Sequence, residues 1–136
     1  MIVFLSCVKT KANHRCKAED MYISPLFRYS LQYAKSLNPR RIFILSAKYG
    51  LLELNDIIDP YELTLNHMSE KERKRWAYDV CMELQRKNID YDEKAVFLCG
   101  TNYRKYLVQK FPNHEVPLEG MGMGKQLRFL SRKSKI

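Results

Sequence analysis

Polar and cationic residues follow three hydrocarbon-rich segments of this chain, each within one or two positions of the segment's end. These stretches are Ser-Cys-Val-Lys-Thr-Lys at residues 6–11, Ser-Ala-Lys-Tyr-Gly at residues 46–50 and Cys-Gly-Thr-Asn-Tyr-Arg at residues 99–104. Ligands of open parallel sheets bind outside the carboxyl ends of the strands. We therefore expect one crevice rich in hydrogen-bond donors and positive charge. The competing interpretation is three ordinary strand-to-helix turns that need small residues.

Cys7 is the candidate nucleophile of this crevice. The thiolate is the reactive form of cysteine, and the nearby cations of Lys9 and Lys11 favour it. No histidine is obviously placed to act as its base, since His14 lies in a polar stretch whose path the sequence does not fix. A buried and inert Cys7 is the alternative.

Candidate acids and bases lie in the one acidic part of the chain, where residues 42–68 carry four acidic side chains and one basic one. Asp59 and Glu62 face the expected crevice if the segment folds back over the second strand end. Either carboxylate could then move a proton or pair with Lys48. Asp59 could equally do no more than cap the turn at Pro60.

A glycine-rich segment, Gly-Met-Gly-Met-Gly-Lys at residues 120–125, precedes the last expected helix. Bare backbone N–H groups at a helix start suit a phosphate. The segment departs from the Walker pattern, because Glu119 stands where glycine is needed and Gln126 replaces Ser or Thr. It departs from the dinucleotide fingerprint, because Lys125 replaces the third glycine. An anion-binding nest and a flexible turn both stay open.

The four cysteines are Cys7, Cys16, Cys81 and Cys99. The opening residues lack a basic region and are too short for a signal peptide, so we expect reduced thiols in a cytoplasmic protein. The spacing of Cys7, His14 and Cys16 matches no common zinc pattern, and a fourth ligand is not evident. We expect neither a metal nor a cofactor.

Positive charge is concentrated at the two ends of the chain. The 136 residues carry a net charge of +9, and residues 1–41 and 101–136 each hold eight basic against two acidic side chains. Such blocks favour a nucleotide or nucleic-acid partner, while the plainer interpretation is a soluble surface with a basic tail. No apolar run approaches the roughly 20 residues that a membrane span needs.

The expected elements alternate between strand and helix. Short, uncharged, β-branched runs predict buried strands, and apolar residues three and four apart predict helices. Ser24-Pro25 and the capping box Ser69–Glu72 mark two helix starts. The strands are expected at residues 2–8, 41–47 and 94–99, with a fourth at 114–118. The helices are expected at residues 25–37, from Ser69 onward, at 102–111 and at 125–131. Residues 9–23 and 48–68 are expected to be loops.

This order predicts one α/β domain over residues 1–136. The strands are apolar throughout, which is typical of a parallel sheet covered on both faces. We expect a three-layer α/β/α, Rossmann-like arrangement with a mostly parallel sheet of about four strands. Composition and spacing do not predict an oligomeric state or a strand order.

Five phrases in order resemble an uncharacterised bacterial and phage domain family. The chain has Ser-Cys at residues 6–7, Met-Tyr-Ile-Ser-Pro-Leu-Phe at 21–27, Leu-Ser-Ala-Lys-Tyr-Gly-Leu at 45–51, Pro-Tyr-Glu-Leu-Thr-Leu at 60–65, and Pro-Leu-Glu-Gly-Met-Gly-Met-Gly-Lys-Gln-Leu at 117–127. That family usually has Asp at the position of Glu62, so this chain keeps a carboxylate there on a longer side chain. The family has no established activity, so the resemblance locates a site without naming a reaction.

The central phrases also resemble the larger YaaA peroxide-stress family, which is associated with DNA binding and iron-linked oxidative stress. That resemblance covers only the middle of the chain, which is too short for the remaining parts of that family. Cys7 and Lys11 resemble the cysteine and lysine of a Pro-Cys-x-x-x-Lys-Pro-Tyr phrase of archaeosine synthase, although the prolines are absent. This second resemblance implies 7-deazaguanine base chemistry.

The leading hypothesis is an enzyme, or a descendant of one, that binds or modifies a nucleobase, a nucleotide or nucleic acid. Its proposed catalytic residues are Cys7, Lys11, Lys48, Asp59 and Glu62. Its proposed ligand-binding residues are Ser6, Lys9, Tyr22, Ser24, Ser46, Tyr49, Gly50, Tyr61, Gly100, Thr101, Gly122, Gly124 and Lys125. These ligand-binding residues are expected to contact a phosphate, a carbonyl group or the ring of a base.

Two alternatives stay open. The first is a DNA-binding module without catalysis that uses the basic blocks at both ends, including Arg128, Arg132, Lys133 and Lys135. Binding of that kind is sensitive to salt and indifferent to sequence. The second is a phage protein that binds a host factor or sequesters a nucleotide.

Overall fold

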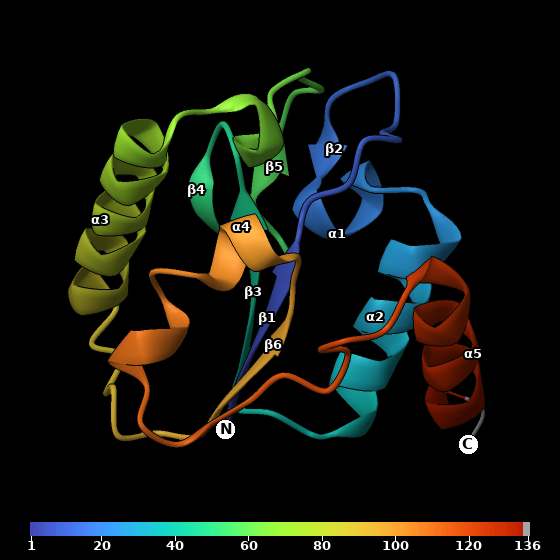
Figure 1. The fold of residues 1–136 in the computed structure, drawn as a ribbon. Coiled ribbons are helices and arrows are strands. Elements are labelled where there is room, and N and C mark those ends of the chain that lie inside the picture. Colours follow the sequence, from blue (N-terminus) through green and yellow to red (C-terminus); the bar gives the residue numbers. More distant parts are fainter. Residues whose placement is uncertain (135–136) are drawn as a thin grey trace.

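A five-stranded, mostly parallel sheet forms the centre of the protein (Figure 1). The computed structural model describes residues 1–134. Strands β1 (Ile2–Ser6), β3 (Arg41–Ser46), β6 (Ala95–Leu98) and β7 (His114–Glu115) run parallel, and β4 (Gly50–Glu53) pairs antiparallel with β3. The strand order is β4-β3-β1-β6-β7, so the expected mostly parallel sheet is confirmed with one more strand than the sequence predicted.

Aromatic side chains of neighbouring strands pack across the middle of the sheet. The ring centroid of Phe4 lies 4.8 Å from that of Phe97 and 5.9 Å from that of Phe43. Phe111, which follows β6 in the chain, contacts Phe4 edge-on at 5.7 Å. All four rings are fully buried. Burial on both faces explains why the parallel strands are continuously apolar and do not alternate.

Helices lie on both sides of the sheet (Figure 1). Helix α3 (Glu70–Arg86) lies on one side, and α2 (Pro25–Ser36) with α5 (Met123–Ser134) lies on the other. The Ser24 hydroxyl accepts the Phe27 N–H, and Ser69 with Glu72 forms the capping box, as the sequence predicts. Asn38, with φ 51°, follows the end of α2 in the left-handed conformation.

Residues 48–68, expected to be a loop, contain regular structure. The chain returns from β3 as β4, pairs Ile57–Ile58 (β5) with Cys16–Lys17 (β2), and then forms the 3₁₀ helix η1 (Leu65–His67). Leu51 and Leu52 are both buried, so β4 has no alternation that a sequence pattern could show. The first loop likewise contains β2 and the short helix α1 (Ala18–Met21).

The helix expected at residues 102–111 is divided in two. Helix α4 (Thr101–Arg104) and the 3₁₀ helix η2 (Val108–Lys110) replace it. Tyr103, Leu107 and Phe111 are all buried, and their i, i+4 spacing fits two short turns as well as one helix. Strand β7 ends at Glu115, short of the predicted Leu118, and α5 begins at Met123, earlier than predicted.

The chain leaves β1 and β6 in opposite directions. From β1 it passes through α2 to β3. From β6 it passes through α4 and η2 to β7, which lies on the opposite side of β1 from β3. The carboxyl ends of β1 and β6 therefore form the kind of switch point at which open α/β sheets bind ligands. No helix within residues 1–134 is long and apolar enough to cross a membrane.

Candidate functional site

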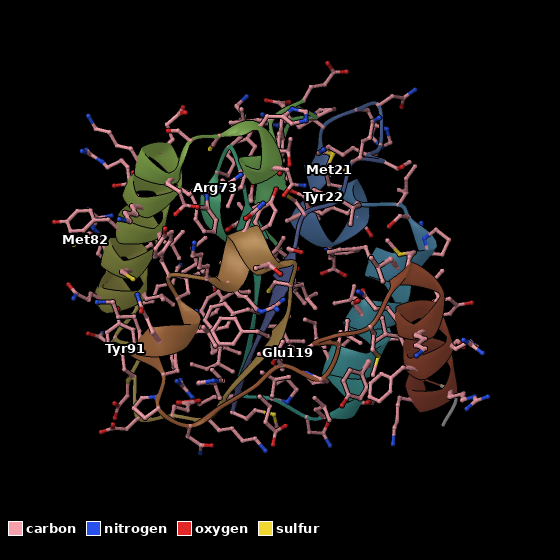
Figure 2. The ribbon with its side chains drawn as sticks, viewed as in Figure 1. Met21, Tyr22, Arg73, Met82, Tyr91 and Glu119 are labelled. Carbon is pink, nitrogen blue, oxygen red and sulfur yellow. The ribbon has the colours of Figure 1, made fainter. Side chains whose placement is uncertain are left out.

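A cavity of about 900 Å³ opens at the carboxyl ends of β1 and β6. Five parts of the chain supply its walls: residues 6–11 at the end of β1, Leu26 and Ser30 of α2, residues 61–67, residues 98–104 around the end of β6, and residues 118–126 before and within α5. These parts are distant in sequence, and the sheet brings the first and fourth together. In Figure 2, Tyr22 and Arg73 lie toward the upper end of the strands, and Glu119 lies on the segment that leads to α5.

Arg73 of α3 holds the 65–67 wall in place. Its guanidinium donates to the carbonyl oxygens of Leu65 at 2.8 Å and Asn66 at 3.2 Å. The Asn102 side-chain amide then donates to Asn66 Oδ1 at 2.8 Å, which ties this wall to α4. The wall is therefore fixed by side chains of two separate helices.

A chain of three hydroxyl groups lies behind the cavity. The Tyr61 hydroxyl lies 2.7 Å from both Ser46 Oγ and the Tyr22 hydroxyl. Burial raises the pKa of both tyrosines, so the phenols stay protonated at neutral pH. Ser46 also accepts the Tyr49 N–H at 3.0 Å, so this hydroxyl group sets the turn after β3 as well as the position of Tyr61.

Lys11 lies against the tyrosine that lines the cavity. Its Nζ is 4.6 Å from the Tyr61 ring centroid, and an isolated β-bridge pairs its backbone with that of Tyr22. Burial lowers the pKa of the Lys11 ammonium, and the nearby charges of Cys7 and Glu62 oppose that effect. The structure thus brings together a thiol, an ammonium and a carboxylate from three of the predicted site positions.

Cys7 contacts a phenol that the sequence reasoning did not select. Its Sγ is 3.2 Å from the Tyr103 hydroxyl, which also accepts the Leu65 N–H at 3.3 Å. Burial, and the charge of Cys7, raise the pKa of Tyr103 to about 12. A protonated Tyr103 can donate to Cys7 once the thiol ionises, because the hydroxyl hydrogen rotates to suit its partner.

Cys99 and Arg104 complete the wall after β6. The Cys99 thiol donates to the Phe4 carbonyl at 3.1 Å, and burial raises its pKa, so it is an inert core group. The Arg104 guanidinium donates to the Cys99 carbonyl at 2.8 Å. Arg104 lines the cavity and adds a third cation to those of Lys9 and Lys11.

Ten of the predicted catalytic and ligand-binding residues lie outside the cavity lining, namely Tyr22 and Ser46 of the hydroxyl chain behind it, Gly122, Gly124 and Lys125 of the glycine-rich segment, and Ser24, Lys48, Tyr49, Gly50 and Asp59. Asp59 forms an exposed ion pair with Arg15 at 3.0 Å, and Lys48 lies over the Tyr49 ring at 5.2 Å. Ser24 serves as the cap of α2, and Gly50 makes the turn into β4 with φ 75°. The Tyr49 hydroxyl accepts the Asp59 N–H at 3.2 Å, so this group of residues stabilises the β3–β4 hairpin and the segment after it.

The glycine-rich segment contributes to the cavity only in part. Gly120 and Met121 line it, whereas Gly122, Gly124 and Lys125 do not. Because α5 begins at Met123, Gly124 is already helical, and the Gly122 carbonyl accepts the Gln126 N–H at 3.0 Å. Of the other predicted ligand residues, those that line the cavity are Ser6, Lys9, Tyr61, Gly100 and Thr101.

The cations of α5 border a separate, shallow hollow of about 530 Å³. Its lining comprises Met121 and Phe129 together with four basic side chains, those of Lys125, Arg128, Arg132 and Lys133. Lys133 Nζ lies 5.8 Å from the Phe129 ring centroid. Lys135, the remaining predicted nucleic-acid residue, lies outside the described residues.

Several cavity residues were missed by the sequence reasoning, namely Thr64, Asn66, His67, Tyr103, Arg104 and Glu119. Tyr103 and Arg104 follow the third strand end and could have been selected on that ground. Residues 64–67 gave no such signal, because only the fold-back of η1 brings them to the site. Within residues 1–134, no group of three or more His, Cys, Asp or Glu side chains is placed to hold a metal ion.

The geometry therefore defines a site in which the Cys7 thiol, three cations, two carboxylates and several hydroxyl groups meet at a strand-end cavity. No curated protein matches the chain. One protein-family model matches residues 2–132, which include every wall of the cavity. The chain belongs to that family, DUF6884, a family of unknown function.

Proposed function

We propose that the cavity binds a nucleobase or nucleotide and that the protein carries out chemistry on the base. The observation that carries the proposal is the convergence of Cys7, Lys11, Glu62 and Arg104 on one cavity beside the Tyr61 ring. A volume of about 900 Å³ falls within the range of small-ligand pockets. The cations of Lys9, Lys11 and Arg104 suit a phosphate, and the hydroxyl and amide groups of the lining suit the edge of a base.

Cys7 is the proposed nucleophile. Its thiolate would add to an electron-poor ring carbon of the bound base, with Lys11 stabilising the negative sulfur before the attack; the ring π bond at that carbon breaks, and its electron pair takes up a proton at the neighbouring ring atom. The Tyr103 hydroxyl supports the same charge from the other side. Glu62, at the exposed mouth of the cavity, would move the proton that the ring gains or loses.

Three further features belong to the same proposal. They are a Rossmann-like, three-layer arrangement, a reducing cytoplasmic location in which Cys7 stays a free thiol, and a distant relationship to the YaaA family. Support comes from helices on both sides of a mostly parallel sheet and from four free cysteines among the described residues.

A thermal-shift screen at low and high salt tests the proposal. The compounds are nucleobases, 7-deazaguanines and nucleoside mono-, di- and triphosphates, since a ligand of the native state raises the melting temperature. We expect a rise that survives high salt with at least one compound and is lost in Lys11→Met. Lys71→Met, at an exposed position of α3, is the charge-matched control. The absence of a shift with all of these compounds would contradict the proposal.

The second candidate function is a DNA-binding module without catalysis. The basic side chains around the α5 hollow favour it, because phosphate contacts need only exposed cations. Under this alternative, short DNA raises the melting temperature at low salt alone, and Lys11→Met leaves that rise unchanged. A phage protein that sequesters a nucleotide would instead bind one compound tightly and leave it chemically unaltered.

A further inference from the structure

The four cations of α5 lie along one side of the helix. We call Lys125, Arg128, Arg132 and Lys133 the α5 cation face. Their spacings of three, four and one residue place them around a common hollow with Phe129 and Met121. From Lys125 to Arg132 the helix rises about 10 Å. The face is thus long enough to contact more than one phosphate of an extended strand.

The α5 cation face gathers four basic side chains around one hollow that no acidic side chain of the described residues lines. Several basic side chains elsewhere pair with carboxylates, as in Arg40–Glu93 at 2.7 Å, Arg41–Glu53 at 2.6 Å and Lys94–Glu115 at 2.9 Å. None of the ion pairs found within residues 1–134 involves a member of the α5 cation face, although all four side chains are exposed. Such an uncompensated basic surface attracts a polyanion.

The α5 cation face adjoins the cavity. Met121 lines both the cavity and the α5 hollow. The first turn of α5 also borders both, because Gln126 lines the cavity while its neighbour Lys125 lines the hollow. The Gln126 side chain donates to the Met121 carbonyl at 2.9 Å, which fixes the shared wall. A single ligand can therefore occupy both hollows by passing over the first turn of α5.

We propose that the ligand of the cavity is one base of a single-stranded nucleic acid, whose flanking phosphates lie on the α5 cation face. This inference rests on the proposed function, since it takes the cavity to be a base pocket. A base in a duplex is stacked and paired, so it reaches a pocket only after extrusion from the helix. An unpaired strand avoids that cost. Phe129, partly exposed between the cations, offers a ring to a sugar or a flanking base.

The test compares binding of three probes by fluorescence anisotropy and competition. The probes are a labelled single-stranded octanucleotide, an abasic strand of the same length and charge, and free nucleoside monophosphates. The α5 variant is Arg128→Gln with Arg132→Gln. Its control is Lys71→Gln with Lys74→Gln, which removes the same charge from exposed positions of α3. Lys11→Met probes the cavity, and melting curves verify that each variant folds.

The proposal predicts that the octanucleotide binds more tightly than the abasic strand and the monophosphates. The α5 variant should flatten the slope of log affinity against log salt for the octanucleotide by about 1.4, the value for two lost contacts to a single strand. It should leave monophosphate binding unchanged, and the α3 control should leave both unchanged. Lys11→Met should weaken the octanucleotide and the monophosphates alike, at least tenfold.

Other outcomes overturn the proposal in distinguishable ways. If monophosphates bind through Lys11 but the α5 variant has no effect on the octanucleotide, the inference fails and the proposed function stands. If the abasic strand binds as well as the octanucleotide and Lys11→Met has no effect, the α5 cation face acts alone as a backbone-binding surface. A parallel sedimentation assay with phosphatidylserine vesicles tests the remaining source of phosphate groups, and tighter binding to them than to the octanucleotide would make the face a membrane surface and overturn the proposal. If no probe binds, the proposed function fails as well.

Discussion

At the residue scale, Tyr103 connects the parts of the site that lie furthest apart in sequence. Its hydroxyl is within hydrogen-bond distance of Cys7 after β1 and of the Leu65 N–H in η1. Its ring packs edge-on against Trp76 of α3, with centroids 5.8 Å apart. The Trp76 indole N–H in turn donates to the Ser46 carbonyl at 2.9 Å at the end of β3. One side chain therefore couples the candidate nucleophile to three elements of the fold.

Replacing Tyr103 by Phe tests its influence on Cys7. The variant keeps the ring but removes the hydroxyl that can donate to a Cys7 thiolate. A hydrogen bond to a charged group contributes about 1.5–3 kcal/mol, so loss of this donor should make Cys7 react several-fold more slowly. Iodoacetamide labelling at neutral pH, quantified by mass spectrometry of the Cys7 peptide, should slow accordingly. Tyr78→Phe, on the exposed face of α3, is the control, and equal rates in all three proteins would contradict this role.

The same phenol predicts how stability depends on alkaline pH. Burial raises the pKa of Tyr103 to about 12, against 10 for an exposed tyrosine. The folded state therefore holds this proton more tightly, and the stabilisation it brings is complete below pH 10. It is lost as the pH rises from 10 through 12, because the unfolded chain ionises first. Urea denaturation over this range should show a falling free energy of unfolding, with a shallower fall in Tyr103→Phe.

At the element scale, the turns that end the strands decide which polar side chains reach the cavity. The β3–β4 hairpin begins at Gly50, with φ 75°, and turns Lys48 and Asp59 away from the cavity. Arg73 and η1 turn residues 64–67 toward it. The position of a residue at a strand end therefore predicts the region of the site, and the geometry of the following turn determines whether its side chain lines the cavity.

Two glycine-to-alanine substitutions separate backbone strain from helix formation. Gly50→Ala should lower the free energy of unfolding by about 1–2 kcal/mol, because an L-residue is strained in the left-handed region. Gly124→Ala should raise it by roughly 0.5–1 kcal/mol, because the position is helical and a Cβ there meets no atom within 4 Å. Chemical denaturation of both variants measures the difference. A higher free energy of unfolding for Gly50→Ala would contradict the left-handed conformation of Gly50, and a lower one for Gly124→Ala would contradict the helical conformation of Gly124.

The sequence predicted the elements whose signals are local and missed those that depend on distant partners. Strands β1, β3 and β6 are uninterrupted apolar runs, and the caps of α2 and α3 lie within three residues of the helix starts. Strand β4 is defined by its pairing with β3, and η1 by its contacts to Arg73, neither of which leaves a sequence period. The same division applies to the site, where residues 6–11 were predicted and residues 64–67 were not.

At the scale of the whole molecule, the strand-end cavity and the basic surface of α5 lie next to each other. The switch point between β1 and β6 carries the cavity, and α5 brings the basic end of the chain to its edge. The match of the family model over residues 2–132 covers both features, in agreement with the resemblance to an uncharacterised family. A fold of this size thus presents a base pocket and a phosphate surface side by side under the proposed function.

The most direct test of the central claim is an amide chemical-shift titration of ¹⁵N-labelled protein with a mixture of the four ribonucleoside monophosphates. The proposed function predicts saturable shifts that concentrate at the cavity, at Cys7, Thr64, Thr101 and Met121. Amides on the outer face of α3, such as that of Tyr78, should not move. Shifts confined to α5, or no saturable shifts at all, would contradict a nucleotide-binding cavity at the ends of β1 and β6.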